Sequence, residues 1–360
     1  MKIVLAIDSF KGCLSSFEAE MAAKEIFARL CPTAAIHCVP LSDGGDGMLE
    51  AYCRNFDCDV IVAACHDALM RPIKGRYAIR KSDGLCILET ASACGINLLK
   101  KEELNPLIAT TYGVGELLTD AVRRGCKSFL IGLGGSATSD CGLGMLKCFR
   151  EMYGELWYKV PSFSLDITLA SDVENPLCGV SGAAHVFAPQ KGANPDDVEC
   201  LERRAQTFSQ MALRKLGRDC SLQKGAGAAG GLGYAFMQFF HAKMQSGATL
   251  LLEEINFANL IAGADFILTG EGCSDRQTLM GKLPQKVLEY GQKEHVSVHL
   301  IAGRIVHKEE LIAAGFQTVR SVNPPDFPLE LALEKETAKK HIQQACAAVF
   351  SHHTGTNFSV

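Results

Sequence analysis

The sequence lacks the features that mark several large classes of protein. Among its 360 residues, 36 Lys and Arg nearly balance 40 Asp and Glu, and no run of like charges occurs, so no surface for nucleic acid or anionic membrane is indicated. No apolar run reaches the roughly 18 residues of a membrane span, and the N-terminal apolar run stops at Asp8, too early for a signal peptide. We therefore expect a cytoplasmic monomer or homodimer whose partner is a small molecule.

Disulfide and zinc patterns are also missing, although the chain contains 16 cysteines. These cysteines are scattered, with no Cys-x-x-Cys pair and no histidine at a zinc-binding spacing. Such a distribution is typical of small hydrophobic residues in a reducing compartment. A nucleophilic hydrolase is disfavoured too, because no Gly-x-Ser-x-Gly motif occurs and the ten histidines are dispersed.

Two glycine motifs for nucleotides are present only in part. Gly281-Lys282 resembles the end of a Walker loop, but Arg276 replaces its first glycine and Leu283 stands where Ser or Thr would bind magnesium. The segment 132–137 has the spacing of a dinucleotide fingerprint, yet no ribose-binding acid follows at the right distance. The first motif is therefore not a P-loop, and a dehydrogenase is a disfavoured alternative.

What the sequence does contain is a series of short apolar runs, each followed by a loop rich in Gly, Ser and Asp and, in several cases, by a helical pattern. This order predicts a parallel βαβ architecture. Ser15 and Glu18 form a capping box that starts a helix ending near Leu30, and Pro284 suits the first turn of a helix over 284–295. The expected strands are 2–7, 35–41, 128–133, 264–269 and 296–303, and a further helix is expected near 47–54.

The pattern changes between about Asp59 and Thr90, where shorter alternating segments predict antiparallel or mixed strands and hence a second domain. A charged amphipathic helix is expected over 194–216, and the glycine-rich segment 225–233 opens an apolar helix. The last ten residues, 351–360, are polar and aperiodic, so we expect them to be frayed.

Acidic residues gather where the expected strands end. In an open α/β sheet the ligand crevice lies outside the carboxyl ends of the strands, and phosphoryl transfer uses such acids to hold magnesium and accept a proton, with lysines and glycine loops for the phosphates. Each acid alone is better explained as a turn or cap, but together they favour a site. The acids are Asp8, Asp43, Asp46, Asp140, Glu271 and Asp275, and the lysines that adjoin glycines are Lys11, Lys191 and Lys282.

Eight further segments stand out between Lys2 and about Gly303. They are AIDSFKGCLSS, PLSDGGDGM, NPLIATTYGVGELL, IGLGGSATSDCGLGM, SDVENPLCGVSGA, FAPQKGA, GAGAAGGLG and LTGEGCSDRQTLMGK. In these segments and in their order the chain resembles a known family, the bacterial glycerate 2-kinases that lack a Walker loop.

The resemblance implies two α/β domains with the active site in the cleft between them. One, over 1–60 and 258–360, is expected to be flavodoxin-like, with a Rossmann-like parallel sheet. The other, over 61–257, is expected to be an inserted restriction-enzyme-like domain with a mixed sheet. The implied reaction is phosphorylation of D-glycerate at the 2-hydroxyl by ATP with Mg²⁺, giving 2-phosphoglycerate. Phosphorylation at the 3-hydroxyl, another hydroxy acid as acceptor, and a catalytically weakened binding relative remain alternatives.

The resemblance and the strand-end pattern together suggest a role for each candidate residue. The predicted catalytic residues are Asp8, Asp43 and Lys11, with Asp8 or Asp43 as general base. The predicted substrate-binding residues are Ser9, Asp46, Glu271, Asp275 and Lys282, of which Glu271 and Asp275 are also the candidates for magnesium. The predicted nucleotide-binding residues are Gly134, Gly135, Ser136, Lys191, Gly227 and Gly230.

The largest departure from the family pattern is Cys273, where an arginine is expected after Gly-Glu-Gly. An arginine can hold a carboxylate or phosphate through two parallel hydrogen bonds, which a cysteine cannot. Arg276 and Arg304 are the two nearby residues that we consider as substitutes for it.

Overall fold

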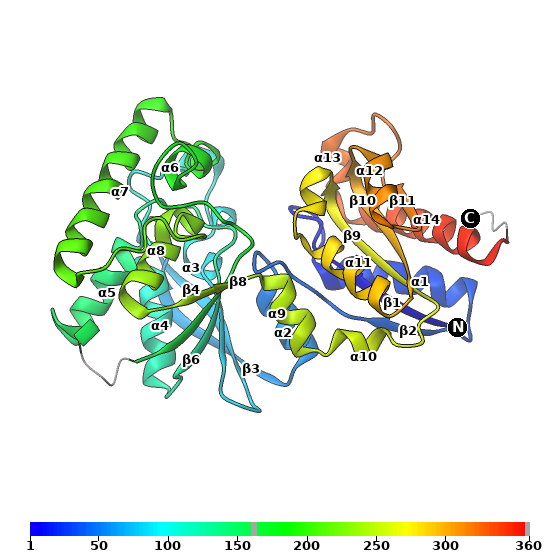
Figure 1. The fold of residues 1–360 in the computed structure, drawn as a ribbon, viewed down its shortest axis with the longest axis horizontal. Coiled ribbons are helices and arrows are strands. Elements are labelled where there is room, and N and C mark those ends of the chain that lie inside the picture. Colours follow the sequence, from blue (N-terminus) through cyan, green and yellow to red (C-terminus); the bar gives the residue numbers. More distant parts are fainter. Residues whose placement is uncertain (160–163, 357–360) are drawn as a thin grey trace. The chain divides into compact units, whose positions relative to one another are not determined.

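The computed structural model describes residues 1–159 and 164–356, and these form two compact units. Unit 1 consists of Met1–Asp43 and Ala248–Val360, and unit 2 of Gly44–Gly247. In Figure 1, unit 1 is drawn in blue and in yellow to red, and unit 2 is drawn mainly in cyan and green. Each unit has its own sheet and its own core.

The sequence predicts unit boundaries at 60/61 and 257/258, but the structure divides the chain at 43/44 and 247/248. The first boundary differs because helix α2 (Met48–Asn55) packs on strand β5 (Cys86–Glu89) of unit 2. The N–H of Leu49 in α2 donates a hydrogen bond of 2.9 Å to Glu89 Oε1. The helix therefore belongs to unit 2, although it follows a strand of unit 1.

The sheet of unit 1 is entirely parallel, with strand order β11-β10-β9-β1-β2. Strand β1, which lies between β9 and the edge strand β2, is buried along nearly its whole length, as expected for a strand covered on both faces. The strands are β1 (Lys2–Ile7), β2 (Ala35–Cys38), β9 (Phe266–Ser274), β10 (Ser297–Ile305) and β11 (Thr318–Ser321).

Helices cover both faces of this sheet. Helices α1 and α14 pack together and form one core with β1, in which Phe27 and Phe350 are in contact. Helix α11 lies against Ile267 and Val298, which by strand alternation face the opposite side. The helices of unit 1 are α1 (Ser16–Leu30), α9 (Gly247–Glu254, starting at the boundary), α10 (Phe257–Ile261), α11 (Leu283–Lys293), α12 (Lys308–Ala314), α13 (Leu329–Ala332) and α14 (Lys335–Thr354).

The local signals for helix ends in unit 1 are confirmed. Ser15 and Glu18 form the predicted capping box, and Pro284 occupies the first turn of α11. Strand β9 is longer than predicted, because it continues to pair with β10 as far as Ser274. Residues 270–274 are therefore strand, where the sequence suggests a loop.

The sheet of unit 2 is mixed, with strand order β3-β4-β5-β6-β7-β8. Strands β3 to β5 pair antiparallel and β5 to β8 pair parallel, so the predicted combination of a parallel-sheet unit with a mixed-sheet unit is confirmed. The strands are β3 (Cys58–His66), β4 (Pro72–Arg80), β5 (Cys86–Glu89), β6 (Ser128–Gly132), β7 (Asp166–Ala170) and β8 (Lys243–Gln245).

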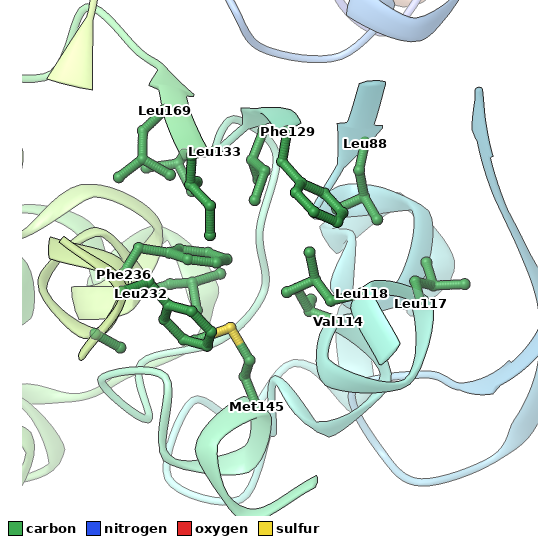
Figure 2. Packing of buried hydrophobic residues seen from close by; sticks show 14 of the residues in the cluster. Leu88, Val114, Leu117, Leu118, Phe129, Leu133, Met145, Leu169, Leu232 and Phe236 are labelled. Carbon is green, nitrogen blue, oxygen red and sulfur yellow. The ribbon is translucent and has the colours of Figure 1, made fainter. Parts of the chain in front are cut away.

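The core of unit 2 lies between this sheet and helices that include α4, α5 and α8. Figure 2 shows Leu88, Phe129 and Leu169 of β5, β6 and β7 pointing toward Val114 of α4 and Phe236 of α8, all of them buried. The helices of unit 2 are α2 (Met48–Asn55), α3 (Ala91–Cys94), α4 (Tyr112–Arg123), α5 (Leu143–Tyr153), α6 (Ala183–Phe187), α7 (Pro195–Leu216) and α8 (Ala228–Phe240).

Two further predictions concern the helix over 194–216 and the C-terminal residues 351–360. The predicted amphipathic helix over 194–216 is confirmed as α7, which Asn194 caps. The C-terminal prediction is wrong for residues 351–354, because α14 runs to Thr354 with Val349 and Phe350 buried in the core, and residues 357–360 lie outside the described part. Within residues 1–159 and 164–356, no helix is long and apolar enough to cross a membrane.

Candidate active site

A cavity of about 460 Å³ opens at the carboxyl ends of β1, β9 and β10 in unit 1. Its lining includes six of the residues predicted from the sequence, all of them in unit 1. These are Asp8, Ser9, Lys11, Asp43, Glu271 and Lys282. The structure thus brings together three of the six acids and two of the three lysines that the sequence pattern singles out.

Asp8 is the most buried acid of this cavity, with only 6% of its surface exposed. It directly follows β1, its N–H donates to Gly270 O at 2.8 Å, and the N–H of Ser9 donates to its Oδ1 at 2.7 Å. Burial raises the pKa of Asp8 well above its ordinary value, and the nearby carboxylate of Asp43 raises it further, against the opposing effect of Lys11. A carboxylate with a raised pKa is a stronger proton acceptor.

Lys11 and Asp43 form an ion pair on the same cavity wall, with 3.3 Å between Nζ and Oδ2. Both side chains remain partly exposed, at 64% and 25%, so a small molecule can reach them. The loop that carries Lys11 lies beside Gly272 of β9, where an added Cβ would lie 3.6 Å from the backbone nitrogen of Lys11, an ordinary van der Waals contact.

Glu271 and Asp275 are engaged in a local hydrogen-bonded turn. Buried Glu271 accepts hydrogen bonds from Ser274 Oγ at 2.9 Å and Thr278 Oγ1 at 2.6 Å. Burial raises the pKa of Glu271, and these two hydroxyls oppose that effect. Asp275 caps the short 3-10 helix η6 (Arg276–Leu279) by accepting from Gln277 N–H. Both acids therefore hold the turn between β9 and α11 in place.

Arg276 and Arg304 are the two arginines considered as substitutes for the one expected at position 273, and their contacts distinguish them. Arg276 is already paired with Glu310, to which it donates three hydrogen bonds of 2.7 to 2.9 Å. Arg304 of β10 is the register partner of Cys273 of β9, and both residues line the cavity. Arg304 is therefore the arginine that reaches the region of Cys273.

The remaining predicted residues lie in unit 2, around two glycine loops that pack on each other. A Cβ on Gly134 would lie 2.3 Å from Gly45 Cα, and one on Gly135 would lie 2.1 Å from Asp46 Oδ1. Asp46 Oδ2 accepts a hydrogen bond of 3.2 Å from Asn97. Asp46 thus lies beside the predicted phosphate loop within unit 2.

Lys191 is buried in unit 2, with 3% of its surface exposed. Its Nζ donates to Thr138 O at 2.6 Å and to Ser136 Oγ at 3.2 Å, and burial lowers its pKa to about 8. Gly230 packs against the same segment of chain as Lys191, since a Cβ added to Gly230 would lie 2.0 Å from Thr138 O. The predicted nucleotide residues Ser136, Lys191 and Gly230 therefore meet around Thr138.

Gly227 stands apart from this group. Its N–H donates to Asn175 O at 2.9 Å, and an added Cβ would lie 2.3 Å from Pro176 O. Asp140, the remaining acid of the strand-end pattern, accepts hydrogen bonds from Thr111 N–H and Gly144 N–H, both at 2.9 Å. These contacts join the starts of α4 and α5, so Asp140 has the structural role that its capping position suggests.

Sequence reasoning missed Glu89, the last residue of β5. Its carboxylate accepts from Leu49 N–H at the start of α2, and burial raises its pKa to about 7, with the nearby charge of Asp46 adding to the effect. An acid directly after the apolar run Cys86–Leu88 is the same signal that identifies Asp8. It is easily overlooked because the segment 59–90 is dominated by its alternating pattern.

Comparisons with known proteins agree with one another. The model of the glycerate kinase family matches residues 3–150 and 159–354. A glycerate kinase of Bacillus subtilis is 34% identical over 359 residues, covering 93% of each chain. A glycerate 2-kinase of Escherichia coli is 32% identical over 353 residues, covering 91% of this chain and 92% of the relative.

A solved structure supports the same assignment. It is a crystal structure from Salmonella typhimurium of a protein provisionally described as glycerate kinase 2, with 31% sequence identity and a TM-score of 0.80. The match covers 99% of this chain and 98% of the other. Since both units and nearly all the segments of the sequence pattern fall within these matches, the chain belongs to the glycerate kinase family and is an enzyme of that family.

Proposed function

We propose that this enzyme transfers the γ-phosphoryl group of ATP to the 2-hydroxyl of D-glycerate, giving 2-phosphoglycerate and ADP. The observation that carries the proposal is the cavity of unit 1, in which a buried Asp8 of raised pKa lies beside the Lys11–Asp43 ion pair. The glycerate 2-kinase of Escherichia coli, which is similar over 353 residues, supports the choice of hydroxyl.

In the proposed reaction Asp8 acts as the general base. It accepts the proton of the 2-hydroxyl while that oxygen forms a bond to the γ-phosphorus, and the bond from the γ-phosphorus to the β,γ-bridging oxygen breaks to release ADP. Lys11, oriented by Asp43, offsets the negative charge that spreads over the transferring group. Proton acceptor and cation are therefore neighbours on one cavity wall.

Magnesium is proposed to enter with ATP, because Mg²⁺ keeps several waters and uses one or two carboxylates together with phosphate oxygens. Among the described residues, no group of three or more His, Cys, Asp and Glu side chains could hold a metal ion by itself. Glu271 Oε2 and Asp275 Oδ2 accept no hydrogen bond within that part of the chain, so these two atoms fit a pair of carboxylate ligands. The ion would neutralise phosphate charge when bound.

For the nucleotide phosphates we propose the loop of Gly134, Gly135 and Ser136, which directly follows β6. Gly135 has φ of +73°, a left-handed conformation of the kind found in anion-binding turns, while the N–H of Gly134 donates to Gly44 O at 3.4 Å. Lys191 supports the loop through its hydrogen bond to Ser136. The proposed contributions of Gly227 and Gly230 are indirect, through the close packing that they permit.

A product assay tests this function. Purified enzyme with ATP, magnesium chloride and D-glycerate should produce ADP and 2-phosphoglycerate in equal amounts, which phosphorus NMR distinguishes from 3-phosphoglycerate. Formation of 3-phosphoglycerate would contradict the proposed hydroxyl. Turnover of a different hydroxy acid without turnover of D-glycerate would contradict the proposed substrate.

A further inference from the structure

Two cations on the cavity wall of unit 1 are candidates for binding an anion. Lys282, the residue before α11, and Arg304 of β10 both line the cavity, and among the described residues neither forms an ion pair or a side-chain hydrogen bond. Other cations of the same unit do: Arg276 is paired with Glu310, and Lys335 with Glu18. Unpaired cations that face a cavity are available to bind an anion.

The strand register places Arg304 on the reacting side of the sheet. Arg304 pairs with Cys273, two residues beyond the pair of Ala302 and Glu271, so strand alternation puts the side chains of Glu271, Cys273 and Arg304 on one face. Asp8 follows Ile7, whose partner is Gly270, and is therefore level with Glu271. At about 3.3 Å per residue, Arg304 is roughly 7 Å further along the strands than Asp8.

Cys273 lies among charges of both signs on the cavity wall. Burial raises the pKa of its thiol, as do the charges of Asp275 and Glu271, whereas Arg304 and Lys282 act in the opposite direction, so both cations lie near this thiol. Cys273 is itself exposed. Its short side chain carries no charge of its own to pair with the guanidinium or the ammonium.

We propose that Arg304, assisted by Lys282, binds the carboxylate of the acceptor and so makes the enzyme selective for hydroxy acids over neutral polyols. The inference rests on the proposed function for the identity of the acceptor. A guanidinium binds a carboxylate through two parallel hydrogen bonds. In a 2-hydroxy acid the carboxylate adjoins the reacting carbon, so an anion held near Arg304 directs the hydroxyl along the strands toward Asp8.

The first experiment measures steady-state kinetics and binding in Arg304→Ala, with Arg276→Ala as the matched arginine control. Loss of a charged hydrogen-bonding pair should raise the KM for D-glycerate, and its Kd by calorimetry, about 10- to 100-fold. The KM for ATP should change less than about twofold. Arg276→Ala should leave both KM values unchanged, because its guanidinium is committed to Glu310.

A second variant separates binding from a structural role. In Cys273→Arg/Arg304→Ala the guanidinium moves to the neighbouring strand, about 4.8 Å away, and affinity for D-glycerate should recover at least about tenfold relative to Arg304→Ala. Recovery of this kind is not expected if Arg304 only supports the fold. An unchanged Kd for D-glycerate in Arg304→Ala overturns the inference.

The two proposals can fail separately. If the parent enzyme binds D-glycerate and Arg304→Ala does not, the inference is supported even if no 2-phosphoglycerate forms, and only the proposed reaction is refuted. If the parent forms 2-phosphoglycerate and Arg304→Ala keeps its KM, the reaction stands and the inference is refuted. A parent that shows no calorimetric binding of D-glycerate refutes the inference as well.

Discussion

The loops of the two units look alike in sequence and differ in what their lysines do. In unit 1, Lys11 is 64% exposed beside a cavity, and Gly12 next to it has open space where a Cβ would be. In unit 2, Lys191 is 3% exposed and bonded to Thr138 O, while Gly230 lies against the same carbonyl. One loop keeps its charge accessible, and the other uses its charge to join two segments.

This comparison teaches that a lysine beside a glycine in a loop or at a helix end has two physical explanations. An accessible lysine can meet an anion from solution, whereas a buried one must satisfy its own hydrogen bonds within the protein. The glycine follows the same division, since it serves chain reversal in one case and close backbone packing in the other. Three experiments test whether the division is real.

The largest effect is expected for Asp8→Asn in unit 1. Removing a general base should lower kcat by about 10²- to 10⁴-fold, with little change in the KM for ATP. The melting temperature should not fall, because burial raises the pKa of Asp8 and the neutral amide avoids placing a charge there. Asp59→Asn, at an exposed acid of unit 2, is the control. A kcat within a few-fold of the parent would falsify the base assignment.

An intermediate effect, on stability, is expected when the closely packed Gly230 and the unobstructed Gly12 are each replaced by alanine. Gly230→Ala places a Cβ 2.0 Å from Thr138 O in a backbone with φ of +65°, so strain and overpacking together should lower the free energy of unfolding by about 3 kcal/mol or more. Gly12→Ala, with φ of +78° and open space, should lose only about 1 to 2 kcal/mol. Urea unfolding measures both, and equal losses would contradict the packing role of Gly230.

The smallest effect is a pH dependence that belongs to Lys191. Burial lowers its pKa to about 8 in the folded protein, so between pH 8 and the ordinary lysine pKa near 10.4 the unfolded chain binds more protons. Stability contributed by this residue therefore rises with pH. Relative to Lys191→Met, the free energy of unfolding of the parent should increase by about 2 kcal/mol from pH 7 to pH 9.5.

The control for this measurement is Lys224→Met, at an exposed lysine of the same unit. Taking the difference between parent and variant removes the contributions of the cysteines and tyrosines, which titrate in the same range. The quantity to compare is the free energy of unfolding of the parent minus that of Lys191→Met. If this difference stays constant or falls between pH 7 and pH 9.5, Lys191 is not shielded from water in the folded protein.

Local signals account for what the sequence predicts correctly. The capping box at Ser15, Pro284 at the start of α11 and the apolar run of β1 are each formed by residues close together in the chain. The grouping of Asp8 with Glu271 is also predictable, because parallel strands bring their carboxyl ends to one edge.

The features that escape prediction depend on distant contacts. The extension of β9 to Ser274 depends on pairing with β10, and the placement of α2 depends on Glu89. The burial of Lys191 depends on Thr138, which lies 53 residues earlier in the chain. Neither periodicity nor motif spacing contains these contacts, so sequence reasoning could name Lys191 as a candidate without foreseeing that it is enclosed.

The interior position of β1, between β9 and β2, has a consequence for how the chain assembles during translation. Ile3 pairs with Phe266, so one edge of β1 stays open until the ribosome has passed residue 266, with only β2 available on the other side. Unit 2, at residues 44–247, is by then complete. Contacts of such long sequence separation form slowly, and an unpaired apolar strand is prone to aggregate, which makes the first seven residues the segment that a chaperone has most reason to cover.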